Sequence, residues 1–212
     1  MADLSFLLFQ EPWWLSAVTK GRYDEVTFKQ GSRVVGRLPF VATRRGPWRV
    51  SVMPAFTHMI GPAVDAGVGK PQTQLMRRLS IIRALIDQLP PFAFFKQIVE
   101  PSIADGLAVA DGLAFQDRGF ELSPQYTFRI DCRGNLKDIW DGMHFKVRQH
   151  IRSAQQKYSV VVIDDPNRFV HFYLENIKRS GKQNRIDFCQ FPELFSQCQT
   201  RNSGEILAAS ND

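Results

Sequence analysis

The stretch MHFKVRQHIRSAQQK, residues 143–157, is the most informative part of the sequence. Apolar residues recur every three or four positions over residues 136–154, which is the spacing of one face of an α-helix. Gly142 interrupts this pattern and can divide it into two helices. Arg148 and Arg152, four residues apart, share one face of the predicted helix. The stretch therefore predicts a basic amphipathic helix.

The cations of this helix have two interpretations. Lys146, His150 and Lys157 run along a face next to that of the two arginines. Like charges one turn apart repel by about 0.2–0.5 kcal/mol per pair, so a helix that carries them can be facing an anion. The other interpretation is a solvated face whose acidic partners come from another element. Spacing alone leaves both open, because Arg serves bidentate phosphate or carboxylate contacts as well as ordinary ion pairs.

Strand and helix patterns alternate on both sides of this stretch. Strands are predicted over residues 23–29, 33–42, 48–53, 92–98, 126–131, 160–163 and 205–209. Further helices are predicted after Pro12, from Pro71 to Pro90, over 103–117, after Asp165 and from Phe191. The turn at 30–32 joins the first two strands into a hairpin, and Pro39 places the second strand at an edge or bends it. The alternation predicts an α/β fold with a mixed sheet.

Composition limits the class of protein. The chain has 212 residues, of which 44% are hydrophobic, enough for one large or two small domains. A net charge of +6 fits an anionic partner, although an ordinary Lys/Arg excess is the favoured explanation because the basic residues would have to be clustered to indicate one. Three cysteines without CxxC spacing argue against a disulfide framework and a zinc site, and predict buried thiols in a reducing cytosol. No apolar run approaches the roughly 18 residues of a spanning helix, which predicts a cytoplasmic protein without stable membrane insertion.

A series of short motifs resembles the Fem-like proteins of the GNAT superfamily, which include peptidoglycan interpeptide-bridge aminoacyltransferases and BioF-like acetyltransferases. The basic helix matches their R-x-x-I-R-x-A-x-K pattern through Arg148, Ile151, Arg152 and Ala154. Residues 54–62 are similar to their P-x-x-T-x-x-x-G-P loop. The remaining matching positions are 11–15, 94–97 and 126–128. The order of these motifs over nearly the whole chain carries the resemblance.

The resemblance implies two GNAT-like halves, the first over residues 1–133 and the second over 134–212. The Gly-rich turn that holds the donor pyrophosphate has no counterpart here, and the strand at 205–209 leads into turn-forming residues. We therefore expect a second half that is incomplete and a chain that is inactive alone. Such enzymes orient an amine against a carbonyl and stabilise the oxyanion, which explains why no nucleophile is visible.

The implied activity is N-acyl transfer, acetyl or aminoacyl, to an amine. The donor would be an acyl-CoA such as acetyl-CoA, or an aminoacyl-tRNA, and no metal is implied. The acceptor would be a small molecule or a cell-wall precursor carrying an amine. The alternative is a non-catalytic nucleic-acid-binding module that uses the basic helix over residues 144–157. No catalytic residue and no oligomeric state can be assigned.

The predicted substrate-binding residues are of two kinds. Lys146, Arg148 and Arg152 come from the basic helix, and the remaining candidates are His58, Gln97 and Tyr126. His58 lies in a loop and suits a polar substrate contact, or else a bond to backbone. Gln97 and Tyr126 are polar groups amid aromatic strands, and they can face a substrate amide or satisfy each other.

Other conspicuous residues have structural interpretations. The pairs Arg44-Arg45 and Arg77-Arg78 are predicted to be solvated surface, and Trp13-Trp14 a buried aromatic pair. The segment 67–71 is similar to a phosphate loop, but Val64 occupies its first Gly position and its final Ser/Thr is replaced by Pro.

Overall fold

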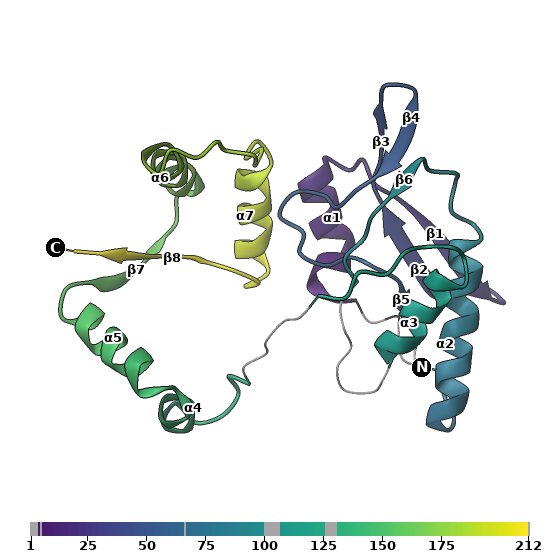
Figure 1. Cartoon of the computed structure of the whole chain (residues 1–212), viewed down its shortest axis with the longest axis horizontal. Helices are drawn as coiled ribbons and strands as arrows, with labels where there is room; N and C mark the ends of the chain where they lie inside the picture. The colour runs from purple at the N-terminus through teal and green to yellow at the C-terminus, as the bar shows by residue number, and fades with distance from the viewer. Residues whose placement is uncertain (1–3, 5, 66, 100–106, 126–130, 212) are drawn as a thin grey trace. The chain divides into compact units, whose positions relative to one another are not determined.

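The chain forms two compact units in a computed structural model that describes residues 4, 6–65, 67–99, 107–125 and 131–211 (Figure 1). Unit 1 comprises Met1–Leu122 and Arg185–Gln197, and unit 2 comprises Ser123–Asn184 and Cys198–Asp212. Both contain helices and strands, and one sheet has parallel as well as antiparallel pairs. The predicted α/β class with a mixed sheet is confirmed.

Sheet A of unit 1 consists of β1 (Asp24–Gln30), β2 (Arg33–Phe40) and β5 (Ala63–Val64), all antiparallel. The predicted hairpin between β1 and β2 is confirmed, with Gly31 at a φ of 61° in its turn. Pro39 is tolerated in the middle strand because β5 pairs only with Gly36 and Arg37. β2 ends one residue beyond Pro39, and the chain then passes to a second sheet.

Sheet B contains β3 (Ala42–Arg45), β4 (Trp48–Ser51) and β6 (Phe94–Phe95). β3 and β4 are antiparallel, whereas β4 and β6 are parallel and are connected through helix α2. The strand predicted over 92–98 is only two residues long. Beyond Phe95 its regular pairing ends, because the backbone N–H of Ile98 donates to the sulfur of Met53 and Gln97 bonds the backbone of another strand.

Helix α2 (Pro71–Ile86) packs on sheet A together with α3 (Leu107–Gln116), as Figure 1 shows. Leu38, Ile82 and Leu85 are fully buried at this interface. α2 ends four residues before the predicted stop at Pro90. Arg118 bonds the Asp87 carboxylate at this end, and that hydrogen bond lowers the pKa of Asp87.

The prediction that Arg77 and Arg78 are solvated surface is wrong. Arg77 is half-buried and donates to the backbone oxygen of Asp65 at 2.5 Å. Arg78 makes a bidentate ion pair with Asp111 of α3, at 2.6 and 2.8 Å, and only 4% of the Asp111 side chain is exposed. The partners lie in distant segments, so the local charge pattern gave no sign of them.

The N-terminal part of unit 1 contains a short 3-10 helix, η1 (Leu8–Gln10), followed by α1 (Pro12–Thr19). The indole N–H of Trp14 donates to Thr57 at 3.2 Å, and Trp14 is buried, whereas Trp13 is only half-buried. The predicted buried pair is thus correct for one of the two rings. Helix α7 (Phe191–Thr200), whose residues up to Gln197 belong to unit 1, lies beside α1.

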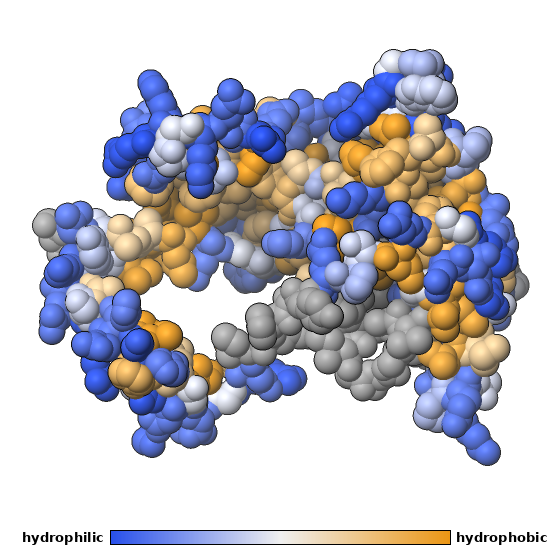
Figure 2. Space-filling view, viewed as in Figure 1, coloured by the Kyte–Doolittle hydropathy of each residue, from blue (hydrophilic) through white to orange (hydrophobic). Residues whose placement is uncertain are grey.

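Unit 2 contains α4 (Leu136–Gly142), α5 (Phe145–Gln155) and α6 (Pro166–Arg179), with the antiparallel pair β7 (Ser159–Ile163) and β8 (Ile206–Ser210). The predicted break at Gly142 is confirmed. Neither α4 nor α5 buries a residue, so the apolar residues predicted to form one stripe over 136–154 are exposed or only half-buried. The break gives the two helices separate axes, and Leu136 remains 83% exposed. Figure 2 shows apolar and polar residues intermixed at the surface of these helices.

The cysteines and the helices allow two further statements. Cys198 is buried, but Cys132 and Cys189 are exposed, so the prediction of buried thiols is wrong for two of the three. Among the described residues, no helix combines the length and the apolar character needed to cross a bilayer.

Candidate functional site

The corner between α4 and α5 holds both predicted arginines. One terminal nitrogen of Arg148 donates to the backbone oxygens of Trp140 and Asp141, at 3.3 and 2.9 Å, which satisfies carbonyls at the end of α4. The guanidinium of Arg152 lies 5.4 Å from the Trp140 ring centroid, within the range of a cation–π contact. The structure therefore brings the two arginines together and gives each a partner at this corner.

The first turn of α5 has an unusual charge arrangement. His144 caps the helix by accepting a hydrogen bond from the Lys146 backbone at 3.3 Å. The N-terminal end of a helix carries a partial positive charge and favours acidic side chains. Here the first turn contains no acid and carries Lys146 and Arg148 instead. Residues 142–163 contain no Asp or Glu at all.

The consequence is a local excess of positive potential at the start of α5. Lys146 is exposed and Arg148 is half-buried, so both are accessible to a ligand. Unit 2 as a whole has twelve Lys and Arg against eight Asp and Glu, whereas unit 1 has fifteen against thirteen. Chemically, this corner can hold a phosphate or carboxylate by charge-assisted hydrogen bonds.

The other predicted site residues belong to unit 1 or lie outside the described residues. His58 is exposed, and its ring centroid is 6.3 Å from that of Phe9. Gln97 donates from its side-chain nitrogen to the backbone oxygen of Pro39 at 2.7 Å, while its side-chain oxygen is buried with no partner among the described residues. Tyr126 lies outside the described residues. The side-chain N–H of Gln97 is therefore occupied by a backbone oxygen of β2 in sheet A.

The Gly-rich loop before α2 is filled by the protein's own groups. The Asp65 carboxylate accepts from the backbone of Gly67 at 2.7 Å and from Arg33 at 2.7 Å. The Arg77 side chain lies directly over Gly67, where an added Cβ would meet it at 3.1 Å. A carboxylate at this helix start opposes a bound phosphate. Val64 and Pro71, where the sequence differs from a phosphate loop, thus flank a loop that is not arranged to bind an anion.

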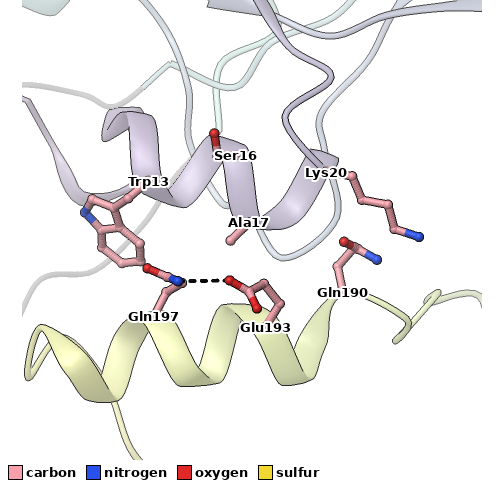
Figure 3. A pocket seen from close by; sticks show the side chains of 7 residues that line it. All are labelled: Trp13, Ser16, Ala17, Lys20, Gln190, Glu193 and Gln197. Carbon is pink, nitrogen blue, oxygen red and sulfur yellow. Dashed lines mark hydrogen bonds between the residues drawn. The ribbon is translucent and has the colours of Figure 1, made fainter.

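A hollow of about 430 Å³ between α1 and α7 was not predicted (Figure 3). Its lining residues are Trp13, Ser16, Ala17, Lys20, Gln190, Glu193 and Gln197. Glu193 accepts a hydrogen bond from the Gln197 side chain at 2.9 Å. Each helix contributes residues spaced by about one turn, but the two helices come from opposite ends of the chain, so no sequence signal joins them.

The end of this hollow near Lys20 carries two opposite charges. The carboxyl of Asp187 has its pKa lowered, first by the hydrogen bond from the Cys189 backbone, then by the Cys189 side chain, and also by the charge of Lys20. In the described part of the chain, no three His, Cys, Asp or Glu side chains are close enough together to hold a metal ion.

A search against models of known protein families and a search among curated proteins both find no match for this chain.

Proposed function

We propose that the chain is a cytosolic N-acyltransferase of the GNAT superfamily, which transfers an acetyl or aminoacyl group to an amine. The ordered motifs from residues 11–15 to the basic helix support this reading. The parallel pair of β4 and β6, connected through α2, is compatible with a GNAT-like first half over residues 1–133.

The observation that carries the proposal is the acid-free start of α5. Both candidate donors, acyl-CoA and aminoacyl-tRNA, present phosphates, and a helix start with Lys146 and Arg148 in its first turn attracts them. In this role the cations bind and orient the donor. The chemistry itself needs the amine to be positioned at the carbonyl and the oxyanion to be stabilised, without a protein nucleophile.

A second candidate is a nucleic-acid-binding module that uses the same helix without catalysis. The absence of acids from residues 142–163 favours it equally, since a phosphate backbone is bound through unopposed cations. The two functions differ in whether the acyl group matters. A transferase distinguishes the charged donor from the uncharged one, whereas an RNA-binding module responds to phosphates alone.

The test is direct binding of three probes to the purified chain: acetyl-CoA, aminoacyl-tRNA and the same tRNA without its amino acid. The proposal predicts binding of acetyl-CoA, or tighter binding of acylated than of deacylated tRNA. Lys146→Gln should weaken this binding, and Lys178→Gln, in the last turn of α6, serves as the matched control of equal charge change. Equal, steeply salt-dependent binding of both tRNAs without acetyl-CoA binding would establish the RNA-binding module instead. Absence of binding to all three probes would refute both functions.

A further inference from the structure

The hollow between α1 and α7 is lined in an unusual way. Helices that lie side by side normally bury apolar stripes against each other. α7 does bury Leu194 and Phe195, and the ring of Phe191 lies 5.4 Å from that of Phe56, which anchors this helix in unit 1. The stripe that it turns toward α1 is polar instead. Its members are Gln190, Glu193 and Gln197.

The facing stripe of α1 leaves room at its centre. Ala17 is small and faces the polar stripe, so the two helices leave a space between them there, whereas the Ser16 hydroxyl points away from α7 (Figure 3). Trp13 stands at one end of α1 and Lys20 at the other. The hollow has a volume of about 430 Å³ and is open to solvent, so a ligand would lie at the surface. A few convergent polar groups in a partly apolar hollow are typical of small-molecule sites.

The charges within the hollow determine which ligand fits. The Glu193 carboxylate points into the space between the helices, and Gln197 already holds one of its oxygens at 2.9 Å. A carboxylate held in this way suits an ammonium group, and the indole ring of Trp13 lies beyond the Gln197 amide in the same hollow. Gln190 adds an amide that can accept or donate.

The opposite end of the hollow suits a negative group less strongly. Lys20 lies there at an exposed position, so solvent weakens its attraction for a carboxylate. A ligand with an ammonium at one end and a carboxylate at the other would therefore gain most from Glu193 and a smaller amount from Lys20.

We propose that this hollow is a binding site for a small aliphatic amine of the amino-acid type, with its ammonium on Glu193 and its carboxylate toward Lys20. The inference rests on residues of unit 1 alone and requires no acyl donor. It is thus independent of the proposed transferase activity.

The test uses three probes of similar length: 6-aminohexanoate, n-hexylamine and hexanoate. Isothermal titration calorimetry of the full chain should show 6-aminohexanoate binding most tightly, hexylamine more weakly and hexanoate not at all. Glu193→Gln should weaken both amines about tenfold, the effect of one charge-assisted hydrogen bond. Lys20→Gln should weaken 6-aminohexanoate only, to the affinity of hexylamine. Glu121→Gln and Lys29→Gln, which make the same charge changes on exposed positions of unit 1, should change neither.

Folding of the variants is checked by thermal unfolding without ligand. Glu193→Gln keeps an oxygen that can accept from Gln197, so the helix should be preserved. The proposal is overturned if none of the probes binds at millimolar concentration. It is equally overturned if hexanoate binds as well as hexylamine, or if Glu193→Gln leaves the amine affinities unchanged. Because no acyl donor is present, either result leaves the transferase proposal standing on its own test.

Discussion

The clearest prediction concerns Lys146→Glu, which should stabilise α5 while weakening its binding of anions. In the protein, Lys146 sits in the first turn of α5, where the helix end is already positive. Replacing it by Glu removes an unfavourable cation and adds a favourable anion at the same position. A substitution that improves the fold and impairs binding identifies a residue kept for its ligand rather than for stability.

The magnitude follows from the position of the charge. One exposed charge in the terminal turn of a helix contributes about 0.3–1 kcal/mol, so reversal from unfavourable to favourable should amount to about 0.6–2 kcal/mol. Amide hydrogen exchange in α5, if it proceeds through local opening of the helix, should slow by about 3- to 30-fold. Binding of tRNA should lose about one unit of its log–log salt dependence, because one phosphate contact disappears.

The matched control is Lys178→Glu. Lys178 lies in the last turn of α6, where a cation is favourable, so the same charge change should speed exchange in α6 rather than slow it. The pair of variants separates the effect of helix position from that of net charge. Faster exchange in α5 of Lys146→Glu, or undiminished tRNA binding, would show that Lys146 is an ordinary solvated residue.

Three further predictions concern unit 1 and the thiols. Gly36→Ala should destabilise unit 1 by about 1–3 kcal/mol in thermal unfolding, because the added Cβ would lie 2.5 Å from Ile81, and Ile81→Ala combined with it should cost less than the sum of the two changes. Asp111→Asn should lower the urea midpoint by an amount equivalent to about 3 kcal/mol, since it leaves the Arg78 guanidinium, only 15% exposed, without its anion; an unchanged midpoint would contradict this. Burial raises the pKa of the Cys198 thiol, so less of it is present as thiolate at a given pH. Iodoacetamide at pH 8 should therefore label the two exposed cysteines before Cys198. Simultaneous labelling would show that Cys198 is accessible.

Turns and helix ends that depend on the backbone of a single Gly or Pro were predicted from the sequence. Gly31 in a tight turn, Pro71 at a helix start and Gly142 between two helices act through their own backbone, and each has the predicted effect. β3 was not anticipated as a separate strand, because Thr43, Arg44 and Arg45 lack the alternation of apolar residues that identifies a half-buried strand.

Long-range partners were not predictable from these patterns. Arg78 is half-buried and paired because α3 brings Asp111 to it, and Gln97 is engaged because Pro39 presents a backbone oxygen from another sheet. The hollow between α1 and α7 is the strongest case, since its lining residues belong to two short helices far apart in the sequence. Only the folded chain shows that Gln190, Glu193 and Gln197 face α1.

The roles of the basic residues can now be separated. Arg148 donates to the carbonyls that end α4, where the helix end is negative, so its charge is largely used in holding the corner. The potential available to a ligand then depends more on Lys146, which has no such acceptor among the described residues and lies in the first turn of α5, at its positive end. Arg148→Gln should consequently lower both the stability of the corner and its affinity for anions, whereas Lys146→Glu should move the two in opposite directions. Measured together by hydrogen exchange and tRNA titration, these opposite patterns distinguish the residue that builds the corner from the residue that binds. If Arg148→Gln reduced affinity while exchange in α4 and α5 stayed unchanged, the ligand contact would belong to Arg148 instead.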